Sequence, residues 1–244
     1  MDLLGFFVWF DPTYMLFVAL PAVLLAAWAQ GMVQSAYARA RRIPARSGLS
    51  GAEAAQRILN VHGIADVAIE PVQSFLGDHY DPKRRVLRLS PDVYHGRSLA
   101  SLGIAAHEAG HAIQDACAYA PLAIRNGLVP MASVGSNLSV MLIIAGLMLT
   151  WMTGLAGVGQ TIAAGGLVLF GIVVLFQIVN LPVEFDASRR AREVLVQQGM
   201  VTLEEDRVVR KVLNAAAMTY VAATITAVLH LLYYASLIYG GRRD

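Results

Sequence analysis

The chain has 244 residues, of which 57% are hydrophobic and only 15% are charged. Globular domains carry about 25% charged residues, so this composition excludes an ordinary soluble fold, a disordered chain and a fibrous protein. A single cysteine cannot form an intramolecular disulfide, which excludes a disulfide-stapled secreted scaffold. The net charge of +2 is small, and the placement of the charges favours a membrane surface over nucleic acid as the partner.

Three long windows without Asp, Glu, Lys or Arg mark the candidate membrane spans. They cover residues 12–38, 126–183 and 212–241. A helix needs about 20 apolar residues to cross a hydrocarbon core about 30 Å thick, so the outer windows hold one span each and the middle window holds two. The sequence therefore predicts a mainly α-helical polytopic membrane protein with four transmembrane helices.

A tight hairpin is expected in the middle window, where turn-forming residues gather between 153 and 160. Just beyond it, Gly157, Thr161 and Gly165 form a stripe of small residues. Such a stripe lets two membrane helices approach closely, so we expect these residues at a helix–helix contact.

The positive charges predict the orientation. Eleven Lys and Arg residues lie within 38–130, six lie within 181–214, and the other two are at the C-terminus. With four spans these two segments share one side of the membrane, which the positive-inside rule makes the cytoplasm. We therefore expect a multi-pass protein of the inner or plasma membrane with both termini outside. Five aromatic residues would anchor the outer interface: Phe6, Phe7, Trp9, Phe10 and Tyr14.

The same pattern predicts five successive parts of the chain. They are an N-terminal segment with the first transmembrane helix at 1–38, a cytoplasmic region at 39–134, a hairpin of two transmembrane helices at 135–181, a cytoplasmic helical segment at 182–213, and the last transmembrane helix with the C-terminus at 214–244.

The cytoplasmic region is predicted to contain two helices. Residues 50–62 have an amphipathic pattern, with Ser50 at the N-cap and Glu53 at the capping-box position. A second helix is expected from Ser98 to about Tyr119.

Short strands complete a small α+β insertion. Residues 67–72 and 86–89 have strand patterns, and the stretch between them at 77–82 is rich in turn formers. If the strand at 86–89 is an exposed edge beside the second helix, an extended peptide could add to it by backbone pairing.

The second helix carries an HExxH motif, formed by His107, Glu108 and His111. Residues four apart project from one helix face, so both imidazoles can reach one zinc ion. Glu108 is offset by one residue, which places its carboxylate where it can take a proton from water and return it to a leaving amine.

A zinc site of this class needs a third protein ligand. Positions 117 and 121 are Cys and Pro, so the motif helix offers no further His at the spacing known from metzincins. Glu184 is a candidate because it directly follows the 58 charge-free residues of the middle window, on the same side of the membrane as the motif. Pro182 just before it suits a helix start or a kink. Asp186 is the rival ligand.

Four stretches together resemble the YugP family of bacterial membrane zinc metallopeptidases. They are residues 79–82, 86–90, 105–114 and 180–190. The likeness covers most of the chain. It extends more distantly to the HtpX and CAAX prenyl proteases, which pair HExxH on one helix with a Glu, often in an E-F-x-A-D setting, on a later one.

The resemblance implies His107, His111 and Glu184 as zinc ligands and Glu108 as the general base. It implies a gluzincin-like site, with the third ligand contributed by a distant helix. The sequence departs from the distant pattern at Ser188, where E-F-x-A-D has its last Asp. That Asp supports a ligating histidine, so here the role would pass to Asp186 or to water.

Three further residues are candidates for stabilising a developing oxyanion: His79, His95 and Arg189. A surface position is the favoured interpretation for both histidines, and a topology-fixing flank charge is the favoured one for Arg189.

The predicted function is that of an integral membrane zinc endopeptidase, with polypeptide and lipid as partners and no nucleic acid. Its substrates would be membrane-associated or cytosolic polypeptides. The sequence leaves open whether the role is membrane protein quality control or specific processing. The alternative is a non-catalytic zinc-binding membrane scaffold or regulator. A transporter is less favoured because the spans lack intramembrane acidic residues.

Overall fold

The computed structural model describes residues 11–73 and 77–240, so the aromatic residues predicted as an anchor at positions 6–10 lie outside it. Among the described residues, four helices are long and apolar enough to cross a membrane, as the sequence predicts. The first combines α1 (Pro12–Tyr14), a π-helical turn η3 (Met15–Ala19) and α2 (Leu20–Ala40). The others are α6 (Ala120–Thr153), α7 (Ala156–Gln197) and α8 (Leu203–Tyr239).

The chain divides into two compact units. The first, here called the membrane unit, consists of residues 1–28, 124–180 and 220–244. The second, the polar unit, consists of residues 29–123 and 181–219. Each of α2, α6, α7 and α8 begins in one unit and ends in the other, so all four contribute residues to both units.

In the membrane unit, α6 and α7 form the predicted hairpin, with Gly154 in the left-handed conformation at the turn. Helices α6 and α7 approach closely at glycines other than those of the predicted stripe. A Cβ at Gly159 would lie 2.5 Å from the Gly146 carbonyl oxygen, and one at Gly166 would lie 2.7 Å from the Ser139 carbonyl oxygen. The predicted stripe is wrong, because a Cβ at Gly157 or Gly165 would meet open space.

The polar unit contains the predicted helices. Helix α3 (Gly51–Val61) begins with the expected capping box, in which Ser50 Oγ accepts from the Glu53 N–H and Glu53 accepts from the Ser50 N–H. Helix α4 (Pro91–Tyr94) is a single turn. Helix α5 (Leu99–Ala116) has Ser98 as its N-cap and includes the HExxH motif.

A three-stranded sheet lies beside these helices, with the order β1–β3–β2. Strands β1 (Ala68–Pro71) and β3 (Val86–Leu89) fall where strands were predicted, but β2 (His79–Asp81) occupies the stretch predicted as turn. Strand β3 is central, parallel to β1 and antiparallel to β2. The hypothesis that residues 86–89 form an exposed edge is therefore wrong, because both sides of β3 are already paired.

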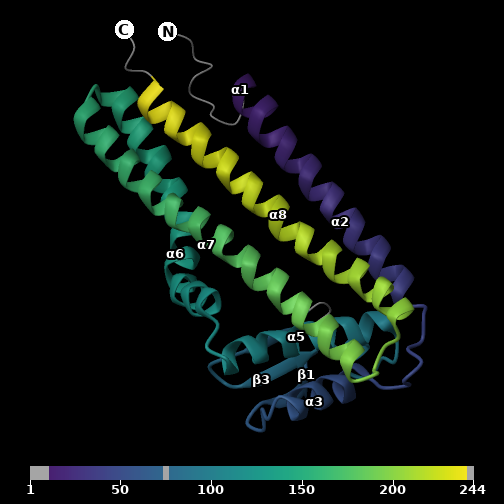
Figure 1. Ribbon diagram of the computed structural model, residues 1–244. Coiled ribbons are helices and arrows are strands. Elements are labelled where there is room, and N and C mark those ends of the chain that lie inside the picture. Colours follow the sequence, from purple (N-terminus) through teal and green to yellow (C-terminus); the bar gives the residue numbers. More distant parts are fainter. Residues whose placement is uncertain (1–10, 74–76, 241–244) are drawn as a thin grey trace. The chain divides into compact units, whose positions relative to one another are not determined.

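The core of the polar unit is built around α5. Its apolar residues are buried against Leu87 and Leu89 of β3, Ile58 and Leu59 of α3, and Leu195 of α7. Helix α5 thus lies together with α3 and the sheet (Figure 1). A helix that is buried this completely holds its side chains in fixed positions, which suits it to carry a site.

Helix α7 continues through Pro182, so the helix start considered at this proline is wrong. Figure 1 shows α7 as one unbroken ribbon. A proline inside a helix removes one backbone hydrogen bond. Packing supports α7 both before and after Pro182. Asn180 before the proline is buried, and so are Val183 and Ala187 after it.

Candidate metal centre

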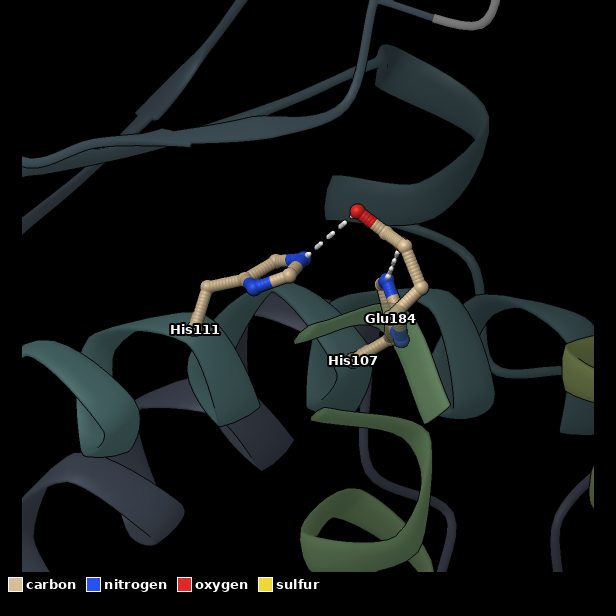
Figure 2. A group of neighbouring side chains, drawn as sticks. All are labelled: His107, His111 and Glu184. Carbon is tan, nitrogen blue, oxygen red and sulfur yellow. Dashed lines mark hydrogen bonds and ion pairs between the residues drawn. The ribbon is translucent and has the colours of Figure 1, made fainter. Parts of the chain in front are cut away.

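Helices α5 and α7 bring three candidate ligand side chains together within the polar unit. Successive turns of α5 carry His107 and His111, whose ring centroids are 4.8 Å apart. Helix α7 presents Glu184 to both rings, with Oε2 3.2 Å from His107 Nε2 and Oε1 3.7 Å from His111 Nε2. Figure 2 shows the Glu184 carboxylate directed at the two imidazoles.

The geometry and the donor types of this group fit zinc. One ligand atom from each of the three residues can be chosen so that all lie within 4.8 Å of one another. Ligand atoms around tetrahedral zinc, at bond lengths of about 2.0–2.2 Å, lie about 3.3–3.6 Å apart. The carboxylate-to-imidazole distances of 3.2 and 3.7 Å are close to that separation. Two imidazoles and one carboxylate are also the donor set of known catalytic zinc sites.

The remaining nitrogen of each imidazole has its own partner. The Nδ1 atom of His107 lies 3.1 Å from Ser188 Oγ, and that of His111 lies 3.0 Å from Gln114 Oε1. With both Nδ1 atoms engaged in this way, both Nε2 atoms face Glu184. Ser188 thus contacts a candidate ligand directly, although a serine stands where the distant pattern has Asp.

Gly110, between the two histidines, allows α5 and α7 to approach. A Cβ at this position would lie 2.6 Å from the carbonyl oxygen of Ala187, nearer than real Cβ atoms approach any neighbour. The absence of a side chain at position 110 therefore allows the separation at which Glu184 reaches the histidines.

Glu108 is buried beside this group. Its Oε2 accepts a hydrogen bond of 3.1 Å from the backbone N–H of Tyr80 in β2. The Tyr80 hydroxyl donates to Asp115 at 2.8 Å, and Arg85 pairs with the same carboxylate at 3.3 Å. Burial and the hydrogen bond to Asp115 raise the pKa of Tyr80, so its hydroxyl remains a donor. Strand β2 is thereby tied to both the middle and the end of α5.

The surroundings of His111 favour the protonated, cationic form of its imidazole. Burial lowers the pKa of this imidazole, but the hydrogen bond to Glu184 and the charges of Glu108 and Glu184 together raise it above the usual value. A metal ion at this site would therefore compete with a proton for His111.

The other predicted residues lie away from the three ligand atoms. Asp186 accepts from Gln114 at 2.9 Å, from Arg190 at 2.6 Å and from Arg189. His79 is exposed and contacts the Gly77 carbonyl oxygen. His95 is exposed and makes an edge-to-face contact with the neighbouring Tyr94.

Two residues of the site were missed by the sequence interpretation, namely Gln114 and Tyr80. Gln114 had a signal, because it lies three residues after His111 on the same helix and so shares its face. No sequence signal pointed to Tyr80, because it contacts Glu108 through its backbone N–H, which every residue except proline has.

A protein with four apolar helices long enough to span a membrane and a His–His–Glu group that could hold a metal ion belongs to the class of multi-pass membrane proteins with a candidate zinc site. Residues 14–239 match the family described as "Putative neutral zinc metallopeptidase", and the chain belongs to that family. It is similar to the "Putative membrane protease YugP" of Bacillus subtilis (strain 168), with 40% identity over 229 residues, covering 94% of this chain and 98% of the relative. No solved structure matches the chain.

These comparisons confirm the resemblance to the YugP family and identify zinc as the cofactor of the family. The group of His107, His111 and Glu184 could bind that ion.

Proposed function

We propose that this protein is a membrane zinc endopeptidase in which His107, His111 and Glu184 bind the metal and Glu108 is the general base. The observation that carries the proposal is the position of Glu108. Its carboxylate is buried beside the three ligands and makes its hydrogen bond to a backbone N–H, so its negative charge is not neutralised by a basic side chain in that contact. A scaffold site would not need a carboxylate there.

In the proposed reaction, Glu108 moves the proton. When bound, zinc supplies Lewis acidity that polarises a peptide carbonyl and makes water more acidic. The Tyr80 N–H holds Oε2 of Glu108, which leaves Oε1 to take a proton from the attacking water. The same carboxyl group then gives the proton to the amine of the leaving peptide, so the base is regenerated at the end of the cycle.

We expect an extended substrate to pair with β2 through backbone groups other than the Tyr80 N–H, which already donates to Glu108. The Tyr80 N–H points to Glu108 on α5, so β2 lies between β3 and the motif helix. A peptide aligned with β2 by backbone contacts would place its scissile carbonyl near the three ligands. Backbone pairing reads little side-chain identity, which supports broad specificity among membrane-associated or cytosolic polypeptides. A role in membrane protein quality control would use such breadth.

The polar unit is proposed to lie in the cytoplasm, with both termini outside, because the positive charges gather in the segments that form this unit. His79, His95 and Arg189 stay predictions as oxyanion donors. Arg189 would have to leave its ion pairs with Asp186 and Glu193 to serve in that way.

The experiment compares Glu108→Gln with His107→Ala in the purified full chain, incubated with an unfolded polypeptide. Glu108→Gln should keep zinc and lose about 10²–10⁴-fold in cleavage rate, the usual contribution of a general base. His107→Ala should lose both zinc and cleavage. Glu193→Gln, a change at an exposed position of α7, is the control and should cleave normally.

The alternative function, a zinc-binding scaffold, predicts a different result. It requires wild-type protein that contains zinc and cleaves nothing, with Glu108→Gln unchanged in every respect. Normal cleavage by Glu108→Gln would instead show that another residue is the base.

A further inference from the structure

Gln114 is a fully buried polar side chain in contact with the candidate zinc ligand His111. Buried amides are normally hydrogen-bonded through both ends, and Gln114 is no exception. Its three partners lie on two helices: His111 on α5, and Val183 and Asp186 on α7.

The partners on α7 determine which way the amide points. Gln114 Nε2 donates to the Val183 carbonyl oxygen at 2.8 Å and to Asp186 Oδ2 at 2.9 Å. A carbonyl and an ionised carboxylate only accept hydrogen bonds. The NH₂ group must therefore face α7, because the flipped amide would place its oxygen against two acceptors. The amide oxygen Oε1 then faces His111.

The orientation of the amide in turn determines the tautomer of His111. Because Oε1 can only accept, the proton of the neutral ring must lie on Nδ1, 3.0 Å away. The lone pair is then on Nε2, the atom that lies 3.7 Å from Glu184 Oε1 and belongs to the ligand group. We propose that Asp186 and Gln114 are positioning residues that fix His111 in its metal-binding tautomer. This inference rests on the proposed zinc site.

Asp186 is itself held in place by two arginines. Arg190 Nε donates to Oδ2 at 2.6 Å, and Arg189 donates to Oδ1. The guanidinium of Arg190 also lies 5.7 Å from the centre of the Tyr119 ring, which restrains it further. The carboxylate of Asp186 thus acts on His111 through Gln114, whereas position 188, where the distant pattern has Asp, contacts His107.

In the part of the chain that the structure describes, the other proposed ligand, His107, has no such relay. His107 Nδ1 contacts Ser188 Oγ, and a hydroxyl can donate or accept. Ser188 therefore does not select a tautomer by itself. The proposal accordingly expects a larger effect from changing Gln114 than from changing Ser188, which makes Ser188→Ala the matched comparison.

The test measures zinc affinity in the purified full chain by competition with a chromophoric chelator, together with the absorption spectrum of the cobalt-substituted protein. Gln114→Met keeps the length of the side chain but removes the amide, and it should weaken zinc binding by about 10–100-fold and alter the cobalt spectrum. Asp186→Asn leaves Val183 as the one obligate acceptor, so it should produce a smaller loss in the same direction.

A double variant tests the polarity of the relay. Gln114→Glu with Asp186→Asn keeps an acceptor for His111 at position 114 and gains a donor at position 186, but it loses the contact with the Val183 carbonyl, which also accepts. It should bind zinc at least about tenfold more tightly than Gln114→Met, which a purely structural role of the amide would not produce.

The proposal is overturned if Gln114→Met and Asp186→Asn both bind zinc within about threefold of wild type with an unchanged cobalt spectrum. It is also overturned if Ser188→Ala loses more affinity than Gln114→Met. Failure of the proposed function is a separate result, because it would show in the wild-type chain itself, either as no zinc binding or as zinc binding without cleavage. Asp186→Asn decides the question if Gln114→Met does not fold.

Discussion

Gly110 of α5 lies so close to Ala187 of α7 that a Cβ at position 110 would stand 2.6 Å from the Ala187 carbonyl oxygen. The neighbour is backbone, which cannot move away as a flexible side chain can. Gly110→Ala should therefore push α7 away from α5 and with it Glu184 from the two histidines. We expect a loss of about 1–3 kcal/mol in stability from overpacking, together with weaker zinc binding.

Gly127→Ala is the matched control for this prediction, because a Cβ at position 127 of α6 would meet nothing within 4 Å. It should leave zinc affinity unchanged and stability equal or slightly higher, since alanine is the better helix former. Equal zinc affinity in Gly110→Ala and Gly127→Ala would show that the α5–α7 distance does not control the site. Thermal unfolding and chelator competition provide the two measurements.

Removal of the metal should destabilise the wild-type chain, but it should not change the stability of a variant that lacks one of the proposed ligands. A ligand that binds only the folded state at 1,000 times its Kd contributes about 4 kcal/mol. A strong chelator should therefore lower the Tm of the wild type and leave that of Glu184→Gln unchanged. Glu193→Gln, also on α7, should respond to the chelator as the wild type does. An equal response of Glu184→Gln would exclude Glu184 as a ligand.

The capping box of α3 should make the polar unit sensitive to acid. The hydrogen bond from the Ser50 N–H lowers the pKa of Glu53, so its stabilising contribution is present above the usual carboxyl pKa and is lost as the pH falls through the folded-state value. Glu53→Gln does not titrate, so the stability difference between wild type and variant should shrink on acidification. Denaturant unfolding followed from neutral to acidic pH checks this. A difference that stays constant over that range would contradict it.

Replacing the other member of the capping box should cost stability at all pH values. Ser50→Ala removes the hydroxyl that accepts from the Glu53 N–H, and loss of such a cap costs about 1 kcal/mol. Ser47→Ala, at an exposed position in the preceding turn, is the control and should change the unfolding free energy by less than about 0.5 kcal/mol.

The orientation of the protein can be tested with its single cysteine. Cys117 is exposed and lies in the polar unit, so a membrane-impermeant thiol reagent should label it only after the cells are opened. In a Cys117→Ser background, Leu155→Cys at the α6–α7 hairpin should be labelled in intact cells. The reverse pattern would show that the polar unit lies outside.

The spans and the motif helix were predictable because each depends on a local pattern. Charge-free windows located the four long helices, and Ser98 marked the start of α5. Strand β2 was not predictable, because three residues with one buried side chain carry no periodic signal and their pairing partner is distant in sequence. The central position of β3 depends on the same non-local pairing.

The candidate site shows a similar division. The HExxH spacing predicts a pair of imidazoles on one face, which the structure has. The close approach of Gly110 to Ala187 depends on how two helices pack, and the relay through Gln114 depends on the carbonyl of Val183. A local sequence pattern predicts neither of these features. The three-residue spacing from His111 to Gln114 could nevertheless have drawn attention to the Gln114 amide.

The unbroken course of α7 has a consequence for the making of the protein. The same helix that contains a membrane-spanning stretch carries Glu184, while both histidines lie on a helix that the ribosome produces earlier. A nascent chain holding α5 and α6 therefore has only two of the three proposed ligands. The centre can be completed only after the third span has been synthesised, so the growing polypeptide has no complete hydrolytic centre during most of its translation.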